Sequence, residues 1–268
     1  MTDELASYFS GEKLYGNDFT IEEICKWFSD EAEGYANLGS KNRDRYVYSY
    51  HQLNRYHGHK FLSGRRFDNA LGIGSAYGDE FKPIIRSISN VTILDPSDAF
   101  AGAKDILGVP CSYQKPNPSG DMDFESGHFD LISSLDVMHH IPNVSHVIDE
   151  CGRCLKRGGV MLLREPITSM GDWRKPRAGL TKRERGIPLP LLEQFIADAG
   201  FTVINRSLCH FPVIPRIAKK IGVVPYNNLA LTMMDSLFGR MFSWNLKYHR
   251  TNFFEKLAPS SAFYVLTR

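Results

Sequence analysis

From residue 67 onward, short apolar runs alternate with helix-like stretches, and this alternation constrains the fold of the 268-residue chain more than any other feature. Parallel strands need crossover connections, usually helices, which cover both faces of the sheet. The pattern therefore predicts an α/β fold with a doubly wound, mostly parallel sheet. The expected strands are 67–74, 91–95, 129–135, 159–166, 201–208 and 261–268, and the expected helices are 78–89, 144–156 and 188–199.

Residues 1–65 precede this pattern and are rich in aromatic and polar side chains. Thr20 followed by Glu23 is typical of a capping box, which predicts a helix over 21–38. On that helix Ile21, Ile24 and Phe28 would share one face. We expect this part of the chain to form a helical lid that keeps water from the site.

A long segment separates the last two expected strands. Because a connection of this length must carry its own structure, we expect a helical insertion there, with a helix over 229–244. The insertion would be a cap over the substrate, a dimer interface or an amphipathic surface facing acidic lipid. The expected organisation is an N-terminal lid at 1–65, a core at 66–208, the insertion at 209–260 and the last core strand at 261–268.

The composition excludes several classes of protein. A net charge of +2 is too small for a surface that binds nucleic acid through general basicity. No apolar stretch is long enough to span a bilayer, and the N-terminal residues are acidic where a secretory signal would be basic, so we expect a cytoplasmic protein without a transmembrane segment. The 5 cysteines do not suggest a disulfide framework, and Cys151 and Cys154 are expected on one face of a helix.

A glycine-rich loop follows the first expected strand and contains Gly72, Gly74 and Gly78. Glycines at the carboxyl edge of a parallel sheet let the backbone approach a nucleotide closely. The third glycine comes one residue later than in the usual dinucleotide motif. Asp95 ends the next strand, where a carboxylate can accept hydrogen bonds from ribose hydroxyls, although Asp95 followed by Pro96 is also typical of a helix N-terminus.

Four motifs occur in a fixed order: ALGIGSAYG (70–78), TILDPSD (92–98), FDLISSLDVMHHIP (129–142) and LKRGGVMLLREP (155–166). This series resembles the class I S-adenosylmethionine-dependent methyltransferases of the small-molecule type. The resemblance implies a Rossmann-like, seven-stranded sheet with an antiparallel last strand. It also implies S-adenosyl-L-methionine as the cofactor.

The same resemblance implies a set of cofactor contacts along the carboxyl edge of the sheet. The transferable methyl group would lie near Leu135, and Asp123 is an alternative to Asp121 as an adenine ligand because the register of that loop is irregular. The methionine part of the cofactor would contact Gly72, Ile73 and Gly74, the ribose Asp95, and the adenine Pro96, Asp121 and Met122.

Two adjacent histidines, His139 and His140, follow the strand that ends beside the expected methyl group. A neutral imidazole can take a proton from a hydroxyl acceptor. We expect at least one of them to be the base or to orient the acceptor, with His140 nearer the cofactor and His139 nearer the substrate; the alternative is that one packs structurally. Glu165 is a third catalytic candidate, which would bind an acceptor hydroxyl or pair with Arg164.

Basic residues concentrate in two segments. Residues 164–185 hold seven bases and three acids, a net charge of +4, and residues 209–260 hold seven bases and two acids, a net of +5, which leaves −7 for the rest of the chain. Guanidinium groups suit carboxylates and phosphates, and an indole ring offers a flat apolar face. We expect an anionic acceptor to bind Arg164, Trp173, Arg174 and Arg177; the alternative is a solvated basic loop.

These features predict a methyltransferase that acts on oxygen, because no N-P-P-Y-like tetrapeptide follows the strand 129–135. The expected acceptor is a phosphorylated, nucleotide-linked or carboxylate-bearing sugar in surface-glycan precursor synthesis, which is an expectation by family analogy. The competing interpretation is a catalytically silent methyltransferase-like module whose basic insertion engages a partner or a membrane surface; a nicotinamide-dependent dehydrogenase is a third. No metal is expected, since His51, His57 and His59 lack further ligands nearby in the sequence.

Overall fold

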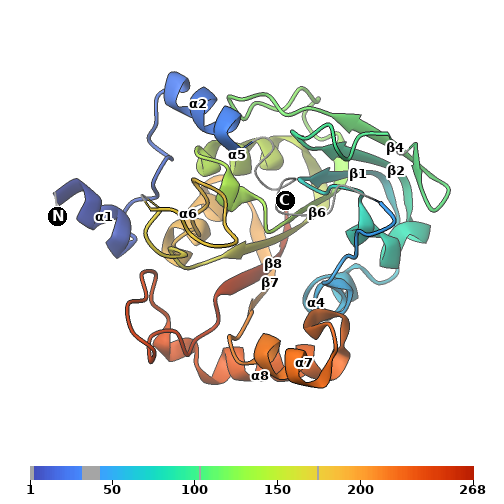
Figure 1. Cartoon of the computed structure of the whole chain (residues 1–268). Helices are drawn as coiled ribbons and strands as arrows, with labels where there is room; N and C mark the ends of the chain where they lie inside the picture. The colour runs from blue at the N-terminus through green and yellow to red at the C-terminus, as the bar shows by residue number, and fades with distance from the viewer. Residues whose placement is uncertain (1–2, 32–42, 103, 174) are drawn as a thin grey trace.

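Among the described residues, eight strands form a single sheet with helices on both of its faces, which confirms the predicted α/β architecture, although the sheet has one strand more than the seven expected (Figure 1). The computed structural model describes residues 3–31, 43–102, 104–173 and 175–268. The strands are β1 (Phe67–Ile73), β2 (Ile88–Leu94), β3 (Asp105–Ile106), β4 (Val109–Gln114), β5 (Phe129–Leu135), β6 (Leu155–Pro166), β7 (Thr202–Cys209) and β8 (Ser261–Thr267).

The strand order is β3-β4-β2-β1-β5-β6-β8-β7. Strands β4, β2, β1, β5 and β6 are parallel, whereas β8 runs antiparallel to both of its neighbours, β6 and β7. The antiparallel last strand is thus confirmed. Sequence analysis missed β3 and β4 because β4 alternates between half-buried and exposed residues and has no apolar run.

The described helices are α1 (Asp3–Ser10), α2 (Ile21–Glu31), α4 (His51–His57), α5 (Val144–Cys154), α6 (Leu189–Asp198), α7 (Ile214–Ile221) and α8 (Leu229–Met241). Short 3-10 segments are η1 (His59–Leu62), η2 (Asp79–Ser87), η3 (Met138–His140), η4 (Pro225–Asn227) and η5 (Ser243–Asn245). The expected helix 78–89 is the 3-10 segment η2, which contains Pro83, a residue that cannot donate a backbone hydrogen bond.

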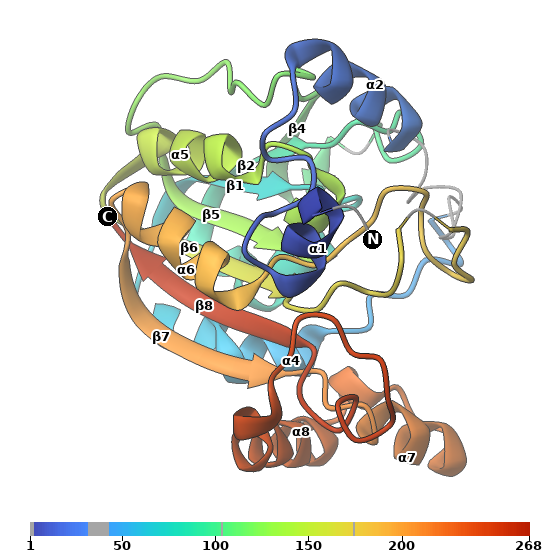
Figure 2. The same ribbon diagram turned by 90° about the vertical axis from the view of Figure 1, so that its left-hand side faces the viewer.

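Helices α5 and α6 cover one face of the sheet, and α4, α7 and α8 lie on the other side (Figures 1 and 2). The first face is closed by a hydrophobic core that includes Ile132 and Leu163, and the second by a core that includes Leu53 and Phe81. Cys151 and Cys154 lie in the first core, fully buried and unpaired, as helix residues that pack against the sheet. The sheet is therefore buried on both faces, which leaves its carboxyl edge for a ligand.

The N-terminal helix α2 begins as the sequence predicts. Glu23 accepts a hydrogen bond from the backbone N–H of Thr20 at 2.8 Å, and the Thr20 hydroxyl accepts one from the backbone N–H of Glu23 at 3.4 Å. The buried residues of this helix are Ile24, Trp27 and Glu31, whereas Ile21 is exposed, so the predicted apolar face was partly wrong. The expected continuation of this helix beyond residue 31 lies outside the described residues.

The insertion between β7 and β8 is helical, as predicted, and consists of α7, η4, α8 and η5. Its long helix α8 packs against α4 and β7. Figure 2 shows α7 and α8 next to each other beyond the β7 edge of the sheet. Among the described residues, none of the helices has the length and apolar character needed to cross a bilayer.

Candidate functional site

A cavity of about 570 Å³ opens at the carboxyl edge of β1, β2, β5 and β6, a volume typical of small-molecule sites. Nine of the residues that sequence analysis singled out line it. Residues 45–50 and helix α2 close the cavity from the N-terminal side. The nine residues are Ile73, Gly74, Asp95, Pro96, Asp121, Met122, Leu135, His140 and Arg164.

The glycine loop lies against the end of strand β5. Gly74 has a φ of +60°, and a Cβ atom there would lie 2.6 Å from the side chain of Val137. Its backbone N–H donates to the carbonyl of Leu94 at 2.8 Å, which ties the end of β1 to the end of β2. Glycine is therefore required at position 74. Gly72, in contrast, does not line the cavity.

Asp95 directly follows β2 and is buried in the cavity wall. Its Oδ2 accepts a hydrogen bond from the backbone N–H of Ala76 at 3.2 Å, and its Oδ1 accepts one from Ser97 at 2.9 Å. Turns rather than a helix follow, so the alternative of a helix N-terminus is not realised. The carboxylate thus joins the glycine loop to the end of β2, at the position expected for a ribose ligand.

The loop before β5 brings Asp121 and Met122 to the cavity, whereas Asp123 does not line it. Met122 is buried, and Asp121 is exposed. The Asp121 carboxylate lies 2.8 Å from Nε2 of His146 and accepts a hydrogen bond from the Ser119 hydroxyl at 2.7 Å. This placement favours the predicted register over the alternative at Asp123.

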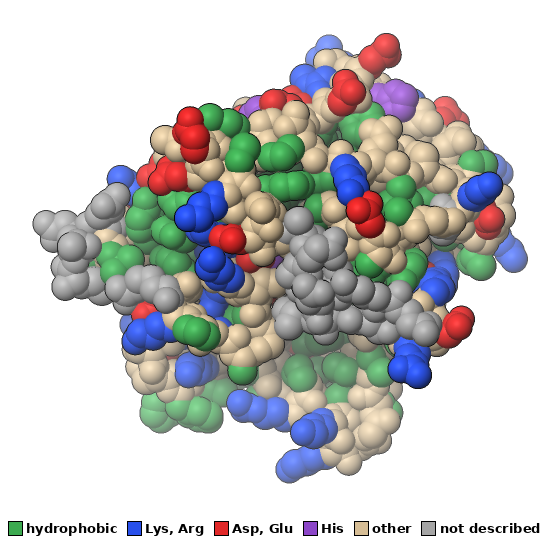
Figure 3. All heavy atoms as spheres, turned by 45° about the horizontal axis from the view of Figure 1, so that its top comes forward, with side chains coloured by type: hydrophobic (Ala, Val, Ile, Leu, Met, Phe, Trp, Pro, Cys, Tyr) green, Lys and Arg blue, Asp and Glu red, His purple; other side chains and the backbone are tan. Residues whose placement is uncertain are grey.

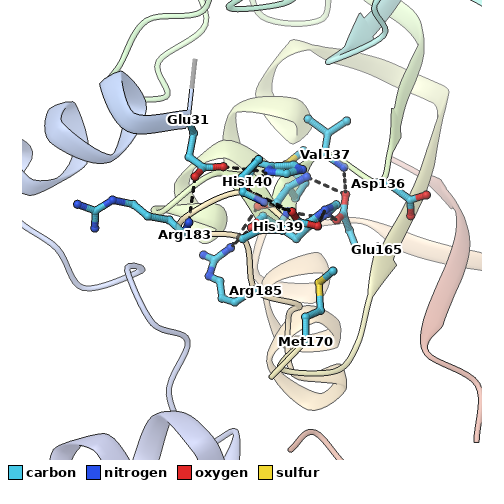
Figure 4. A network of polar contacts seen from close by, with 12 residues as sticks. Glu31, Asp136, Val137, His139, His140, Glu165, Met170, Arg183 and Arg185 are labelled. Atoms are coloured by element: carbon cyan, nitrogen blue, oxygen red, sulfur yellow. Dashed lines mark hydrogen bonds and ion pairs between the residues drawn. The ribbon is translucent and has the colours of Figure 1, made fainter. Parts of the chain in front are cut away.

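Glu165 holds the loop that follows β5 rather than facing the cavity. Its carboxylate accepts hydrogen bonds from three consecutive backbone N–H groups, those of Val137 (2.9 Å), Met138 (2.8 Å) and His139 (3.2 Å). It also lies 2.8 Å from Nδ1 of His139 (Figure 4). The side chain is fully buried and does not line the cavity, so the geometry indicates a positioning role.

Arg185 holds the same loop from the opposite side. Its guanidinium donates to the carbonyls of His139 (2.9 Å), Ile141 (2.8 Å) and Pro142 (3.1 Å), and also to that of Tyr15 (2.9 Å). Burial lowers the pKa of Arg185 to about 10, so the group stays charged at neutral pH. The loop is thus fixed by a buried carboxylate at its N–H groups and a buried guanidinium at its carbonyls.

His139 is buried between two carboxylates. Nδ1 lies 2.8 Å from Glu165 and Nε2 lies 3.4 Å from Glu184. Burial disfavours the charged imidazole, but the hydrogen bonds to the two carboxylates outweigh it and raise the pKa of His139 to about 9. At neutral pH both ring nitrogens of His139 are therefore protonated, and the side chain does not line the cavity. His139 is for both reasons unsuited to be a general base.

His140 lines the cavity. Its Nδ1 lies 3.1 Å from the carboxylate of Glu31 at the end of α2 (Figure 4). Its carbonyl accepts a hydrogen bond from the indole N–H of Trp27 at 2.7 Å. Burial, together with the charge on His139, lowers the pKa of His140 below its usual value. A neutral imidazole at the wall is the protonation state that a general base needs.

The described residues contain one group of potential metal ligands, formed by His139, His140 and Glu184, whose ligating atoms lie within 4.8 Å of one another. A metal there would have to displace the proton that His139 shares with its carboxylates. His57 instead lies 2.7 Å from the Ser207 hydroxyl and, in the part of the chain that is described, belongs to no such group.

Arg164 reaches the cavity but pairs with Asp136 rather than with Glu165. Its guanidinium lies 2.7 Å from Oδ2 of Asp136, donates to Oδ1 of Asn54 at 2.7 Å and lies over the ring of Tyr50 at 4.5 Å. Asp136 has a φ of +60°, and its buried Oδ1 has no hydrogen-bond partner among the described residues. This oxygen is therefore available to a polar or cationic ligand in the cavity.

The other predicted acceptor contacts lie away from the cavity. Trp173 packs on the rings of Phe9 at 4.4 Å and Tyr15 at 5.3 Å, and Arg177 donates to main-chain carbonyls of its own loop. Neither residue lines the cavity. Arg174 lies outside the described residues.

Sequence analysis missed three acidic residues of the cavity wall, Glu31, Glu80 and Asp136. Asp136 could have been predicted as a site residue, because it directly follows Leu135 at the carboxyl end of β5. Glu31 meets His140 from 109 positions away, a separation that no local pattern reveals. Glu80 is buried, which raises the pKa of its carboxyl to about 7.

Comparison with known proteins agrees with this geometry. Residues 71–163 match a family model described as a methyltransferase domain. The ubiquinone biosynthesis O-methyltransferase of Shewanella pealeana is 29% identical over 93 residues, a segment that covers 33% of this chain and 39% of the relative. The chain thus matches less than half the length of this curated relative, and the same holds for related enzymes of Dechloromonas aromatica and Nitrosococcus oceani.

Solved structures share the fold at low identity. A Leishmania major S-adenosylmethionine-dependent methyltransferase superposes with a TM-score of 0.52 at 11% identity, over 92% of this chain and 82% of that one. The [4+2]-cyclase SpnF superposes with a TM-score of 0.56 at 12% identity, over 93% and 97% of the two chains. Because one of these two proteins is named a cyclase, a shared fold alone does not establish which reaction is catalysed.

The buried His139 predicts a pH-dependent stability. Because its folded pKa of about 9 exceeds the unfolded value of 6.5, its contribution is fully present below pH 6.5 and is lost as the pH rises through 9. We expect the wild type to exceed His139→Gln in free energy of unfolding on the order of 3 kcal/mol at pH 6.5, and the difference to shrink by pH 9. Urea titrations at several pH values measure this difference, and one that stays constant would contradict the assignment.

Proposed function

Because residues 71–163 match a methyltransferase-domain model, we propose that this chain is a class I S-adenosylmethionine-dependent methyltransferase that transfers the methyl group of S-adenosyl-L-methionine to a hydroxyl oxygen of a small acceptor molecule. The observation that carries the proposal is the neutral His140 at the cavity wall, close along the chain to the end of β5 at Leu135. The curated relatives, which are O-methyltransferases by name, support oxygen as the methylated atom.

The cavity fits the cofactor in charge as well as in size. Five acidic residues line it against two arginines, and the arginine Arg164 is already paired with Asp136. This acidic wall suits the sulfonium and ammonium groups of S-adenosyl-L-methionine. The acids are Glu31, Glu80, Asp95, Asp121 and Asp136, and the second arginine is Arg45.

We propose specific roles for the residues along the carboxyl edge. Ile73 and Gly74 would bind the methionine part, Asp95 the ribose hydroxyls, and Pro96 and Met122 the adenine, with Asp121 at its amino group. Leu135 would lie beside the methyl group. Their shared position on one cavity supports this assignment, and Gly72 would act from behind the wall by allowing the loop to pack closely.

The acceptor that the wall favours is a neutral, hydroxylated molecule with an apolar ring. Aromatic side chains of Phe28, Tyr46, Tyr48 and Tyr50 line the cavity on the N-terminal side. The acidic wall gives no support to the anionic sugar expected from the basic segment 164–185, because an anion would meet like charge. A ring with a hydroxyl group would instead stack on the aromatic side chains.

Catalysis would consist of positioning, exclusion of water and removal of one proton. The cofactor supplies an electrophilic methyl group. With the Nδ1 proton of His140 donated to Glu31, Nε2 is the nitrogen that can take the proton of the acceptor hydroxyl. Helix α2 supplies Trp27, which fixes the backbone of His140, and Phe28, which closes the cavity. The N-terminal segment would therefore act as part of the site and as its lid.

Substitution of Asp95 tests whether its carboxylate binds the cofactor. Asp95→Asn keeps the shape of the side chain but removes its charge, so we expect calorimetry to show S-adenosyl-L-methionine binding weakened about 10- to 100-fold. The matched control is Asp123→Asn, which lies outside the cavity lining and should bind as the wild type does. Wild-type affinity in Asp95→Asn would refute the ribose role, and a wild type that does not bind the cofactor would favour the silent module.

Substitution of His140 tests whether this residue acts as the general base. Hydroxylated aromatic compounds, sugar phosphates and nucleotide sugars would be screened for release of S-adenosylhomocysteine by the wild type. With the acceptor found, we expect His140→Gln to lower kcat about 10²- to 10⁴-fold while cofactor affinity stays within a few-fold. His128→Gln is the control, because His128 precedes β5 at the end of the strand opposite the cavity and does not line it. A kcat unchanged in His140→Gln would show that no base acts from this position.

A further inference from the structure

Helix α8 exposes a row of apolar side chains to solvent, although polar residues occupy much of its buried side. Its buried side carries polar and small residues, among them Thr232, Asp235, Ser236 and Gly239. Asp235 accepts hydrogen bonds from the backbone N–H groups of His210 at 2.9 Å and Phe211 at 2.7 Å. The helix is therefore held at the end of β7 by these polar contacts together with the apolar packing of Leu231 and Phe238, and a second set of apolar side chains stays exposed.

The outer side of α8 is a continuous apolar stripe. Leu229, Met233, Leu237 and Met241 recur every four residues and are each between 51% and 56% exposed. Residues four apart lie on one face of a helix, so these side chains form a row along its length. Exposed apolar groups of this extent indicate a docking surface, because a monomer in water has no reason to retain them.

Further exposed apolar side chains occur in the same insertion. Ile221 ends α7, Val223 and Val224 follow it, and Trp244, which is 79% exposed, follows α8. Phe253 and Phe254 add two exposed rings in the loop that leads to β8. We define this set, from Ile221 to Phe254, as the apolar face of the insertion.

The charges around the apolar face are of one sign. Exposed bases occur on α7 at Arg216, Lys219 and Lys220 and on α8 at Arg240. Of the two acids in 209–260, Asp235 is buried and Glu255 is paired with Lys247. In Figure 3, Lys and Arg side chains gather at the lower edge of the molecule, where Figure 1 places α7 and α8, whereas Asp and Glu side chains lie mainly above.

We propose that the apolar face of the insertion docks this protein onto a lipid bilayer that contains anionic headgroups. Apolar side chains rimmed by bases, with an exposed indole, match the acyl boundary and the negative surface of such a bilayer. A second copy of the chain fits less well, because a two-fold interface would bring the same unopposed bases face to face. Charge complementarity thus selects the bilayer over a homodimer.

The insertion that carries the apolar face also contacts the wall of the cavity. Tyr50, which lines the cavity, stacks on Tyr226 of η4 with ring centroids 5.8 Å apart, and η4 lies between α7 and α8 in the chain. Helix α4, which follows Tyr50, packs directly on α8. Docking would therefore place the aromatic side of the cavity near the bilayer surface, whether or not the acceptor proposed above is correct.

The test is sedimentation of the full-length protein with phosphatidylcholine vesicles, with and without phosphatidylglycerol. We expect binding only to the anionic vesicles, weakened by salt, together with a blue shift of tryptophan emission. Trp27 and Trp173 are buried, so the shift reports on Trp244. Met233→Ser/Leu237→Ser and, separately, Lys219→Glu/Lys220→Glu should each lower binding about 10-fold or more.

The control variant is Lys104→Glu/Leu107→Ser, which changes an exposed base and an exposed apolar residue at the opposite edge of the same sheet. It should bind vesicles as the wild type does. Because all substituted side chains are exposed, circular dichroism should show every variant folded. The proposal is overturned if the folded wild type does not bind anionic vesicles or if all variants bind them equally. It is also overturned if ultracentrifugation shows a dimer that Met233→Ser/Leu237→Ser abolishes while no binding to vesicles is detected.

Discussion

The loop after β5 depends on two buried charges that never touch the cavity. The Glu165 carboxylate accepts three consecutive backbone N–H groups, and the Arg185 guanidinium donates to the carbonyls on the other side of the same turn. Unsatisfied backbone groups in such a buried loop would each be costly, so the two side chains fix one conformation. That conformation places Asp136 and His140 at the cavity and keeps His139 behind it.

The same constraint explains why two adjacent histidines differ in charge. His139 shares its protons with Glu165 and Glu184 and carries a positive charge, and this charge helps to keep its neighbour His140 neutral. Glu31 then orients the neutral ring from the N-terminal helix α2. The N-terminal segment is therefore fastened to the site through contacts at both His140 and Arg185.

Six of the eight strands in the described part of the chain, and the residues that line the carboxyl edge of the sheet, could be predicted from the sequence because both follow from local patterns. Gly74, Asp95 and Leu135 each end a strand or follow one directly, and parallel strands bring their carboxyl ends together. The arginine-rich segment was misleading, because charge density along the chain does not reveal whether a guanidinium faces a ligand or a main-chain carbonyl. Arg185 is such a case: long-range backbone contacts decide its role, and a lone sequence does not show them.

The geometry gives Glu165 the role of shaping the cavity through the loop, without binding a substrate itself. Calorimetric titration of Glu165→Gln with S-adenosyl-L-methionine tests it most directly, with Glu193→Gln on α6 as the control and circular dichroism as a check of the fold. We expect the affinity for the cofactor to be about 10-fold or more lower in Glu165→Gln, because the amide cannot satisfy the same donors. Wild-type affinity in the folded variant would rule out this role of Glu165.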